Sequence, residues 1–134
     1  GGRSRPVFVK IAPDVAEDDL PAIVERMLAH AVDAIAVSNT TLARPGLSMV
    51  PAAREAGGLS GKPLFHRSTA MLARVHGLTK GAVPLIGIGG ITTPEAALAK
   101  IEAGATLLQL YTGLIYEGPG LVTAAARSIK TLRQ

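Results

Sequence analysis

Apolar residues in this chain alternate between short, nearly continuous runs and longer stretches with helical spacing. The runs that read as buried strands span Val7–Ile11, Ala34–Ser38, Pro84–Ile88 and Leu107–Tyr111. The stretches with helical spacing span Asp18–His30, Ser68–Leu78, Pro94–Ala103 and Gly120–Leu132. Continuous apolar runs are typical of parallel strands, because helices cover a parallel sheet. The pattern therefore predicts four βα units around a parallel sheet.

The repetition of βα units with short αβ turns favours a (β/α)8 barrel over an open sheet. Barrel closure needs eight strands and about 250 residues, whereas this chain has 134 residues and four strand candidates. We therefore expect an α/β fold that forms half of a (β/α)8 TIM barrel, with residues 1–134 as one partial domain. Its unpaired edge strands predict self-association, pairing with a complementary half, or aggregation.

Composition narrows the classes of function. Hydrophobic residues make up 48% of the chain, and cysteine is absent, which excludes a disulfide scaffold, a thiolate metal site and a cysteine nucleophile. The net charge is +4, but the basic residues are scattered, so nucleic acid is not expected as a partner. The sequence has no apolar run of about 18 residues and no apolar stretch of a signal peptide near its start. We expect an intracellular protein.

Each strand candidate ends in residues suited to holding a ligand. The endings are Lys10, Ser38–Thr40, Gly87–Gly90 and Tyr111–Gly113. Loops converge at the carboxyl ends of parallel strands, where helix N-termini also present free N–H groups. The four endings therefore predict one ligand site.

The glycine-rich ending Gly87–Gly90 is not a dinucleotide fingerprint, because Thr92 stands where a third glycine is required. Two glycines before a helix suit direct capture of a phosphate by backbone N–H groups. Thr93 and Pro94 are expected to cap that helix, and Gly104 to end it. The alternative is a tight turn that needs glycine only for backbone reasons.

The other endings carry side-chain chemistry. Lys10 faces either the barrel mouth, where a ligand with developing negative charge would justify it, or the helices as a snorkelling surface lysine. Ser38–Thr41 supplies hydroxyl and amide groups that suit a planar heterocycle or a carboxylate, with simple strand-end capping as the alternative. The irregular segment Thr41–Lys62 contains Gly57–Gly61 and is long enough for a lid or a binding loop.

The three histidines do not predict a metal site. His30, His66 and His76 have no carboxylate or second histidine at metal-like spacing. Helix ends and surface positions are the expected places for them, and no metal is expected.

Seven short sequence motifs of the chain resemble those of the quinone-linked, class 2 dihydroorotate dehydrogenases. These motifs are Val9–Asp14, Ser38–Thr41, Gly57–Leu64, Pro84–Gly90, Ala103–Ala105, Leu108–Thr112 and Gly118–Pro119. They follow the family order over nearly the whole chain. The Asn-Thr-Thr and Leu-Tyr-Thr forms favour class 2 over the soluble class 1 enzymes.

The resemblance implies an FMN-containing barrel that oxidises dihydroorotate to orotate in pyrimidine biosynthesis and passes electrons to a membrane quinone. Lys10 would stabilise charge on the reduced flavin, and Asn39 and Thr40 would hold the substrate for hydride transfer. Ser38 stands where relatives often carry Thr, a change that keeps the hydroxyl. The implied cofactor-binding residues are Lys10, Ser38, Thr40, Ser60, Gly61, Leu64, Ile88, Gly89, Gly90, Leu110, Tyr111 and Thr112.

The same resemblance makes this chain the C-terminal half of the (β/α)8 TIM barrel and assigns part of the chemistry to the preceding half. The family's catalytic base, a serine that removes the C5 proton, has no counterpart here, so no catalytic residue is expected in this chain. Quinone and membrane contacts belong to an N-terminal region that is also missing. We expect the chain alone to be inactive, and the full-length enzyme to lie peripherally on the inner membrane of a bacterium.

Two other hypotheses are compatible with the residues. One is a phosphate-binding half-barrel of another metabolic isomerase or lyase. The other is a non-catalytic module that oligomerises.

Overall fold

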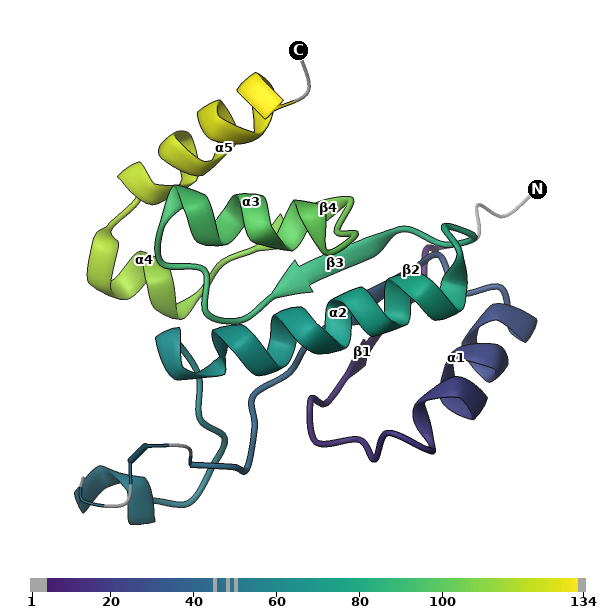
Figure 1. The fold of residues 1–134 in the computed structure, drawn as a ribbon, viewed down its shortest axis with the longest axis horizontal. Helices are drawn as coiled ribbons and strands as arrows, with labels where there is room; N and C mark the ends of the chain where they lie inside the picture. Colours follow the sequence, from purple (N-terminus) through teal and green to yellow (C-terminus); the bar gives the residue numbers. More distant parts are fainter. Residues whose placement is uncertain (1–4, 45, 48, 50, 133–134) are drawn as a thin grey trace.

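The computed structural model describes residues 5–44, 46–47, 49 and 51–132, which form alternating strands and helices (Figure 1). The strands are β1 (Phe8–Ile11), β2 (Ala34–Val37), β3 (Leu85–Ile88) and β4 (Leu107–Gln109). The helices are α1 (Leu20–Ala29), α2 (Phe65–Thr79), α3 (Pro94–Glu102), α4 (Thr112–Glu117) and α5 (Gly120–Leu132). Two 3-10 turns, η1 (Pro51–Arg54) and η2 (Lys62–Leu64), lie in the segment before α2.

The four strands form one parallel sheet in the order β1-β2-β3-β4. Consecutive strands are neighbours, and each connection runs through a helix, as expected for successive βα units of a barrel. The predicted fold class, four βα units in a half-barrel arrangement, is therefore confirmed. Strands β1 and β4 are the two edges of this sheet.

The two faces of the sheet differ because successive side chains of a strand point to opposite sides. Ile35 and Val37 of β2 are both 0% exposed and belong to the core that contains residues of α1 and α2. The register pairs Phe8 with Ala34 and Lys10 with Ala36 on the opposite face. On that face Phe8 is 56% exposed. Helices thus cover one face, whereas the other carries exposed apolar and polar side chains.

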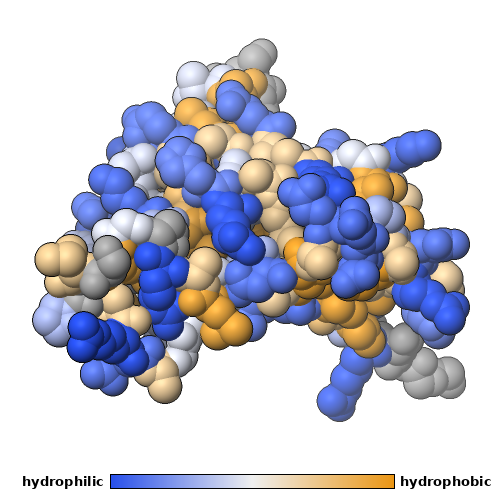
Figure 2. Space-filling model, turned by 60° about the horizontal axis from the view of Figure 1, so that its bottom comes forward, coloured by the Kyte–Doolittle hydropathy of each residue, from blue (hydrophilic) through white to orange (hydrophobic). Residues whose placement is uncertain are grey.

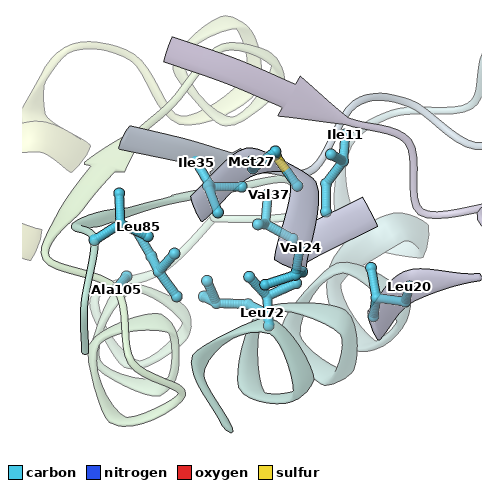
Figure 3. Close-up of a cluster of buried hydrophobic side chains, with 11 residues drawn as sticks. Ile11, Leu20, Val24, Met27, Ile35, Val37, Leu72, Leu85 and Ala105 are labelled. Atoms are coloured by element: carbon cyan, nitrogen blue, oxygen red, sulfur yellow. The ribbon is translucent and has the colours of Figure 1, made fainter. Parts of the chain in front are cut away.

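The core lies between the sheet and the two helices α1 and α2, as Figure 3 shows. Leu20, Val24 and Met27 recur with helical spacing and form the buried stripe of α1. Leu72 and Val75 of α2 are fully buried against them. Burial of each such side chain stabilises the fold by about 1.5–3 kcal/mol relative to its exposed state.

The helix that follows β3 begins and ends as the sequence predicts. The Thr93 hydroxyl accepts a hydrogen bond from the Ala96 N–H at 3.1 Å, and Pro94 is the first helical residue. Gly104 follows the end of α3 with a φ of +106°. Other boundaries differ: α1 starts at Leu20 rather than Asp18, and α2 starts at Phe65 rather than Ser68.

One helix is absent from the prediction. The segment after β4 forms α4, and Gly118 directly follows this helix with a φ of +74°. The sequence analysis assigns no helix to this segment, and α4 has only six residues with a glycine, Gly113, at its second position. The tertiary fold overrides these weak local preferences, since α4 packs against α5.

The predicted irregular segment Thr41–Lys62 lies between β2 and α2, and backbone pairing joins residues near its two ends. Thr41 and Leu59 form an isolated antiparallel bridge through two backbone hydrogen bonds, at 3.1 and 2.7 Å. Pro45, Ser48 and Val50 of this segment lie outside the described residues.

The view from the bottom of Figure 1 shows a mixed surface, with apolar patches in orange between hydrophilic side chains in blue (Figure 2). Within the described residues, no helix combines the length and the hydrophobicity that crossing a membrane requires.

Candidate functional site

A cavity of about 240 Å³ lies at the carboxyl ends of the four strands. Its lining includes every residue that the sequence analysis assigns to a cofactor or a substrate, and three further residues. The lining residues are Lys10, Ser38, Asn39, Thr40, Ser60, Gly61, Leu64, Ile88, Gly89, Gly90, Ile91, Gln109, Leu110, Tyr111, Thr112 and Gly113. The four strand endings therefore meet in one place, as predicted, although the roles of the single residues are not thereby tested.

Lys10 lies on the sheet face opposite the helices, in register with Ala36. The geometry thus selects the side of the cavity over the side of the helices, which were the two possibilities open at the sequence level. Within the described residues Lys10 has no hydrogen bond or ion pair with the protein. Its ammonium group is therefore available to a ligand in the cavity.

The end of β2 presents one buried and two exposed polar side chains. Ser38 is 1% exposed and its hydroxyl donates to the Asn39 carbonyl at 2.9 Å. Asn39 and Thr40 are exposed at the cavity. The Ser38 hydroxyl is thereby occupied locally, whereas the amide of Asn39 and the hydroxyl of Thr40 are better placed to contact a ligand.

A polar network holds the connections after β1 and β2 together. Asp14 accepts a hydrogen bond from the Thr41 hydroxyl at 2.6 Å and another from the Leu42 N–H at 2.8 Å. Arg67 of α2 forms an ion pair with the same carboxylate at 3.1 Å and donates to the Pro13 carbonyl at 3.0 Å. Partial burial raises the pKa of Asp14, but the hydrogen bonds and the Arg67 charge outweigh it, so the pKa lies below its usual value.

The loop that contains Gly57–Gly61 lies against the cavity. Arg44 donates to the carbonyls of Thr41 and Leu42, both at 3.0 Å, and to that of Gly57. The Thr112 hydroxyl donates to that of Ser60 at 3.1 Å and so links this loop to the start of α4. These contacts place Ser60 and Thr112 side by side on one wall of the cavity.

Packing against α2 requires glycine in the Gly89–Gly90 turn, whether or not a ligand binds there. Both glycines have positive φ values, +98° and +73°, and a Cβ on Gly90 would overlap the backbone of Phe65. The tight-turn alternative therefore accounts for the two glycines. Yet Gly90 and Ile91 are buried, and neither backbone N–H has an acceptor within the part of the chain that the structure describes. Buried N–H groups normally have one.

A buried lysine that the sequence analysis missed lies beneath this turn. Lys100 is 0% exposed, and its Nζ donates to the Ser68 hydroxyl at 2.6 Å and to the Ile88 carbonyl at 3.2 Å. Burial lowers the pKa of Lys100 to about 7. The signal available in the sequence was its position three residues after Ala97, on the apolar face of α3.

The histidines take no part in the site. His30 directly follows α1 and is exposed, His66 is exposed on α2, and His76 packs beneath Gly104. Within the described residues, no group of three or more His, Cys, Asp or Glu side chains could hold a metal ion.

Comparison with known proteins identifies the family. The sequence profile described as dihydroorotate dehydrogenase matches residues 2–132. A dihydroorotate dehydrogenase (quinone) of Rhizobium leguminosarum bv. trifolii is 52% identical over 131 residues, which cover 98% of this chain and 36% of the relative. The enzyme of the same name from Rhizobium rhizogenes is 54% identical over 120 residues, which cover 90% and 33%. The chain thus spans about a third of the length of these relatives.

Solved structures agree with the sequence comparison. A crystal structure of DHODH from Eimeria tenella in complex with ferulenol matches with a TM-score of 0.90 at 35% identity, covering 98% of this chain and 35% of that one. A ligand-free structure from the same organism matches with a TM-score of 0.88. The resemblance drawn from the sequence is confirmed, and the chain belongs to the dihydroorotate dehydrogenase family.

Proposed function

We propose that the full-length protein oxidises dihydroorotate to orotate with FMN as its cofactor, passes the electrons to a quinone, and serves pyrimidine biosynthesis. One observation carries this proposal: the residues that the family resemblance assigns to cofactor and substrate line a single cavity, although they are distributed from Lys10 to Thr112 along the chain. The two Rhizobium relatives described above are both named dihydroorotate dehydrogenase (quinone), which supports the same reaction.

The residues present fit FMN. The buried N–H groups of Gly90 and Ile91 have no acceptor among the described residues, which suits the phosphate, because a phosphate oxygen accepts hydrogen bonds. Ser60 and Thr112 add hydroxyl groups on the same cavity wall. Bound FMN would supply the acceptor for a hydride from the substrate and the route for electrons onward.

The residues at the ends of β1 and β2 would contribute charge and orientation. Lys10, a cation at the cavity without a partner among the described residues, would offset negative charge that develops on the cofactor. Asn39 and Thr40 would hold the planar, polar substrate in a fixed orientation toward the cofactor, since amide and hydroxyl groups both donate and accept hydrogen bonds.

The site within this chain is a part of the complete one. A cavity of about 240 Å³ is smaller than the roughly 300–1,000 Å³ that is typical of sites for drug-sized ligands. We propose that the remainder of the full-length protein supplies the catalytic base and the contacts with quinone and membrane, that the enzyme is peripheral on the membrane, and that residues 1–134 alone are a partial, inactive domain.

Flavin spectroscopy on the purified full-length protein tests the function. We expect visible flavin absorbance, bleaching when dihydroorotate is added without oxygen, and recovery of the absorbance when a short-chain quinone follows. The matched control is orotate, which should bind without bleaching. Absence of flavin, or flavin that dihydroorotate does not bleach, would contradict the proposal.

We further propose that the chain by itself self-associates through the open side of its sheet. In the part of the chain that the structure describes, the outer edges of β1 and β4 have no partner strand, and Phe8 and Leu107 on these strands are 56% and 58% exposed. Sedimentation of the 134-residue chain at increasing concentration checks this, because a strictly monomeric chain would contradict it.

A further inference from the structure

Lys100 occupies an unusual place for a lysine. Its side chain is fully buried between α3, α2 and the end of β3, and its Nζ lies 5.4 Å from the centroid of the Phe65 ring. The three directions of the ammonium group are taken by the Ser68 hydroxyl, the Ile88 carbonyl and this ring. None of these groups carries a negative charge.

No carboxylate of the described residues forms an ion pair with Lys100. The two recorded ion pairs join Arg67 to Asp14 and Arg74 to Glu17. Burying a cation without a counter-charge costs free energy, so such cations normally have a functional role or pair with an anion. The Ile88 carbonyl that Lys100 contacts belongs to a residue of the cavity wall. The Lys100 amino group therefore lies directly behind the wall of the candidate site.

The contacts of Lys100 also determine how the glycine turn is oriented. The Ser68 hydroxyl accepts from Lys100 and lies 3.1 Å from the carbonyls of both Gly89 and Phe65, which share its single proton. In a planar trans peptide the carbonyl and the following N–H point in opposite directions. Because Ser68 holds the Gly89 carbonyl, the Gly90 N–H points away from Ser68, and it has no acceptor among the described residues.

We propose that Lys100 is a positioning residue for the anionic phosphate of the cofactor: through Ser68 it orients the Gly90 N–H toward that group, and its ammonium supplies the positive charge behind it. This inference rests on the proposed function, because it takes FMN as the ligand. A purely structural role for Lys100, as a pin between α3 and β3, makes a different prediction, since a pin supports all parts of a bound flavin equally.

Riboflavin separates the two roles, because it shares the isoalloxazine ring and the ribityl chain with FMN but lacks the phosphate. The dissociation constants of FMN and riboflavin are measured by fluorescence quenching on the flavin-free full-length protein and on Lys100→Met and Lys100→Gln variants. The Gln variant removes the charge and retains an N–H donor on a side chain that is one bond shorter. Lys130→Met, an exposed position on α5, controls for the loss of one charge.

We expect both variants at Lys100 to lose roughly tenfold or more in FMN affinity, whereas their riboflavin affinity changes less than about threefold and the Lys130 variant binds both flavins like the wild type. A parallel loss of both affinities would show a structural pin and overturn the role for Lys100 while leaving the proposed function standing. A wild-type protein that binds neither flavin would overturn both.

A measurement on the wild type covers the case in which the variants do not fold. Nitrogen-15 labelling of lysine follows the Lys100 ammonium by NMR, and the uncharged groups that face it are the Ser68 hydroxyl, the Ile88 carbonyl and the Phe65 ring. FMN should raise the pKa of Lys100 from about 7 toward its ordinary value, and riboflavin should not. Equal effects of the two flavins would contradict the proposal.

Discussion

The two halves of the candidate site are supported in different ways by neighbouring residues of α2. At the β1–β2 half, Arg67 reaches the Asp14 carboxylate and the Pro13 carbonyl. At the β3–β4 half, the Ser68 hydroxyl contacts the Gly89 carbonyl and accepts a hydrogen bond from the Lys100 ammonium. The Arg67 and Asp14 side chains are 48% and 26% exposed, whereas Ser68 and Lys100 are fully buried.

This difference in burial indicates which half of the site tolerates substitution of its supporting residues. An exposed ion pair is screened by solvent and contributes little, commonly below about 1 kcal/mol. A buried polar group that loses its partner costs about 1–3 kcal/mol, and more when it is charged. The β1–β2 half therefore presents polar side chains over a tolerant support, whereas the β3–β4 half presents backbone groups over a support that tolerates little change.

The largest expected effect is chemical and lies in the β1–β2 half. In the full-length enzyme, Lys10→Ala should slow flavin reduction by dihydroorotate on the order of 100- to 1,000-fold, the effect typical of losing one group that stabilises developing charge. Stopped-flow bleaching of the flavin measures the rate, with Lys130→Ala as the control. Because Lys10 is exposed, the variant should fold, and the rate is expressed per bound flavin. An unchanged rate would remove Lys10 from the chemistry.

The next effect is structural and lies in the β3–β4 half. Gly90→Ala should lower the free energy of unfolding by about 3 kcal/mol or more, because its φ of +73° is unfavourable for alanine and the new Cβ would overlap the Phe65 backbone. Gly77→Ala is the matched control: this glycine lies inside α2, where a Cβ would meet nothing within 4 Å.

Urea unfolding measures both glycine variants. The Gly77 variant should be more stable than the wild type by up to about 1 kcal/mol, since alanine favours a helix over glycine. If Gly90→Ala were as stable as the wild type, the two halves of the site would not differ in the way described.

The smallest effect is expected for Asp14, whose partly exposed ion pair with Arg67 supports the β1–β2 half. Asp14→Asn should lower the free energy of unfolding by about 1 kcal/mol or less at neutral pH, because it weakens the contacts with Arg67 and the Leu42 N–H. Glu17→Gln, at the other exposed ion pair with Arg74, is the control and should cost still less.

The pH dependence of the Asp14 effect has a defined sign. The pKa of Asp14 is lower in the folded protein than its ordinary value of 3.8, so the charged carboxylate favours the folded state. This stabilisation is fully present above the unfolded-state pKa and is lost as the pH falls through the folded-state pKa. The difference between wild type and Asp14→Asn should therefore shrink below about pH 4. A difference that stays constant from pH 7 to pH 3 would contradict the lowered pKa.

Much of the fold and of the site could be predicted from local pattern. The βα alternation is a property of hydrophobic spacing, and the helix start at Thr93 and Pro94 depends on local capping chemistry. The candidate site followed from a general rule, because the carboxyl ends of parallel strands converge. The helix α4 was not predictable in this way, since it has only six residues and contains Gly113, while packing against α5 stabilises it.

The sequence by itself determined the succession of βα units, the gathering of the strand endings in one site, and the family resemblance, because these depend on order and spacing along the chain. Only the tertiary structure decided that Lys10 lies on the cavity side of the sheet and that Lys100 and Ser68 lie beneath the glycine turn. The physical reason is that burial and hydrogen-bond partners are set by residues distant in sequence. Ser68 and Lys100 are 32 positions apart, and no local pattern relates them.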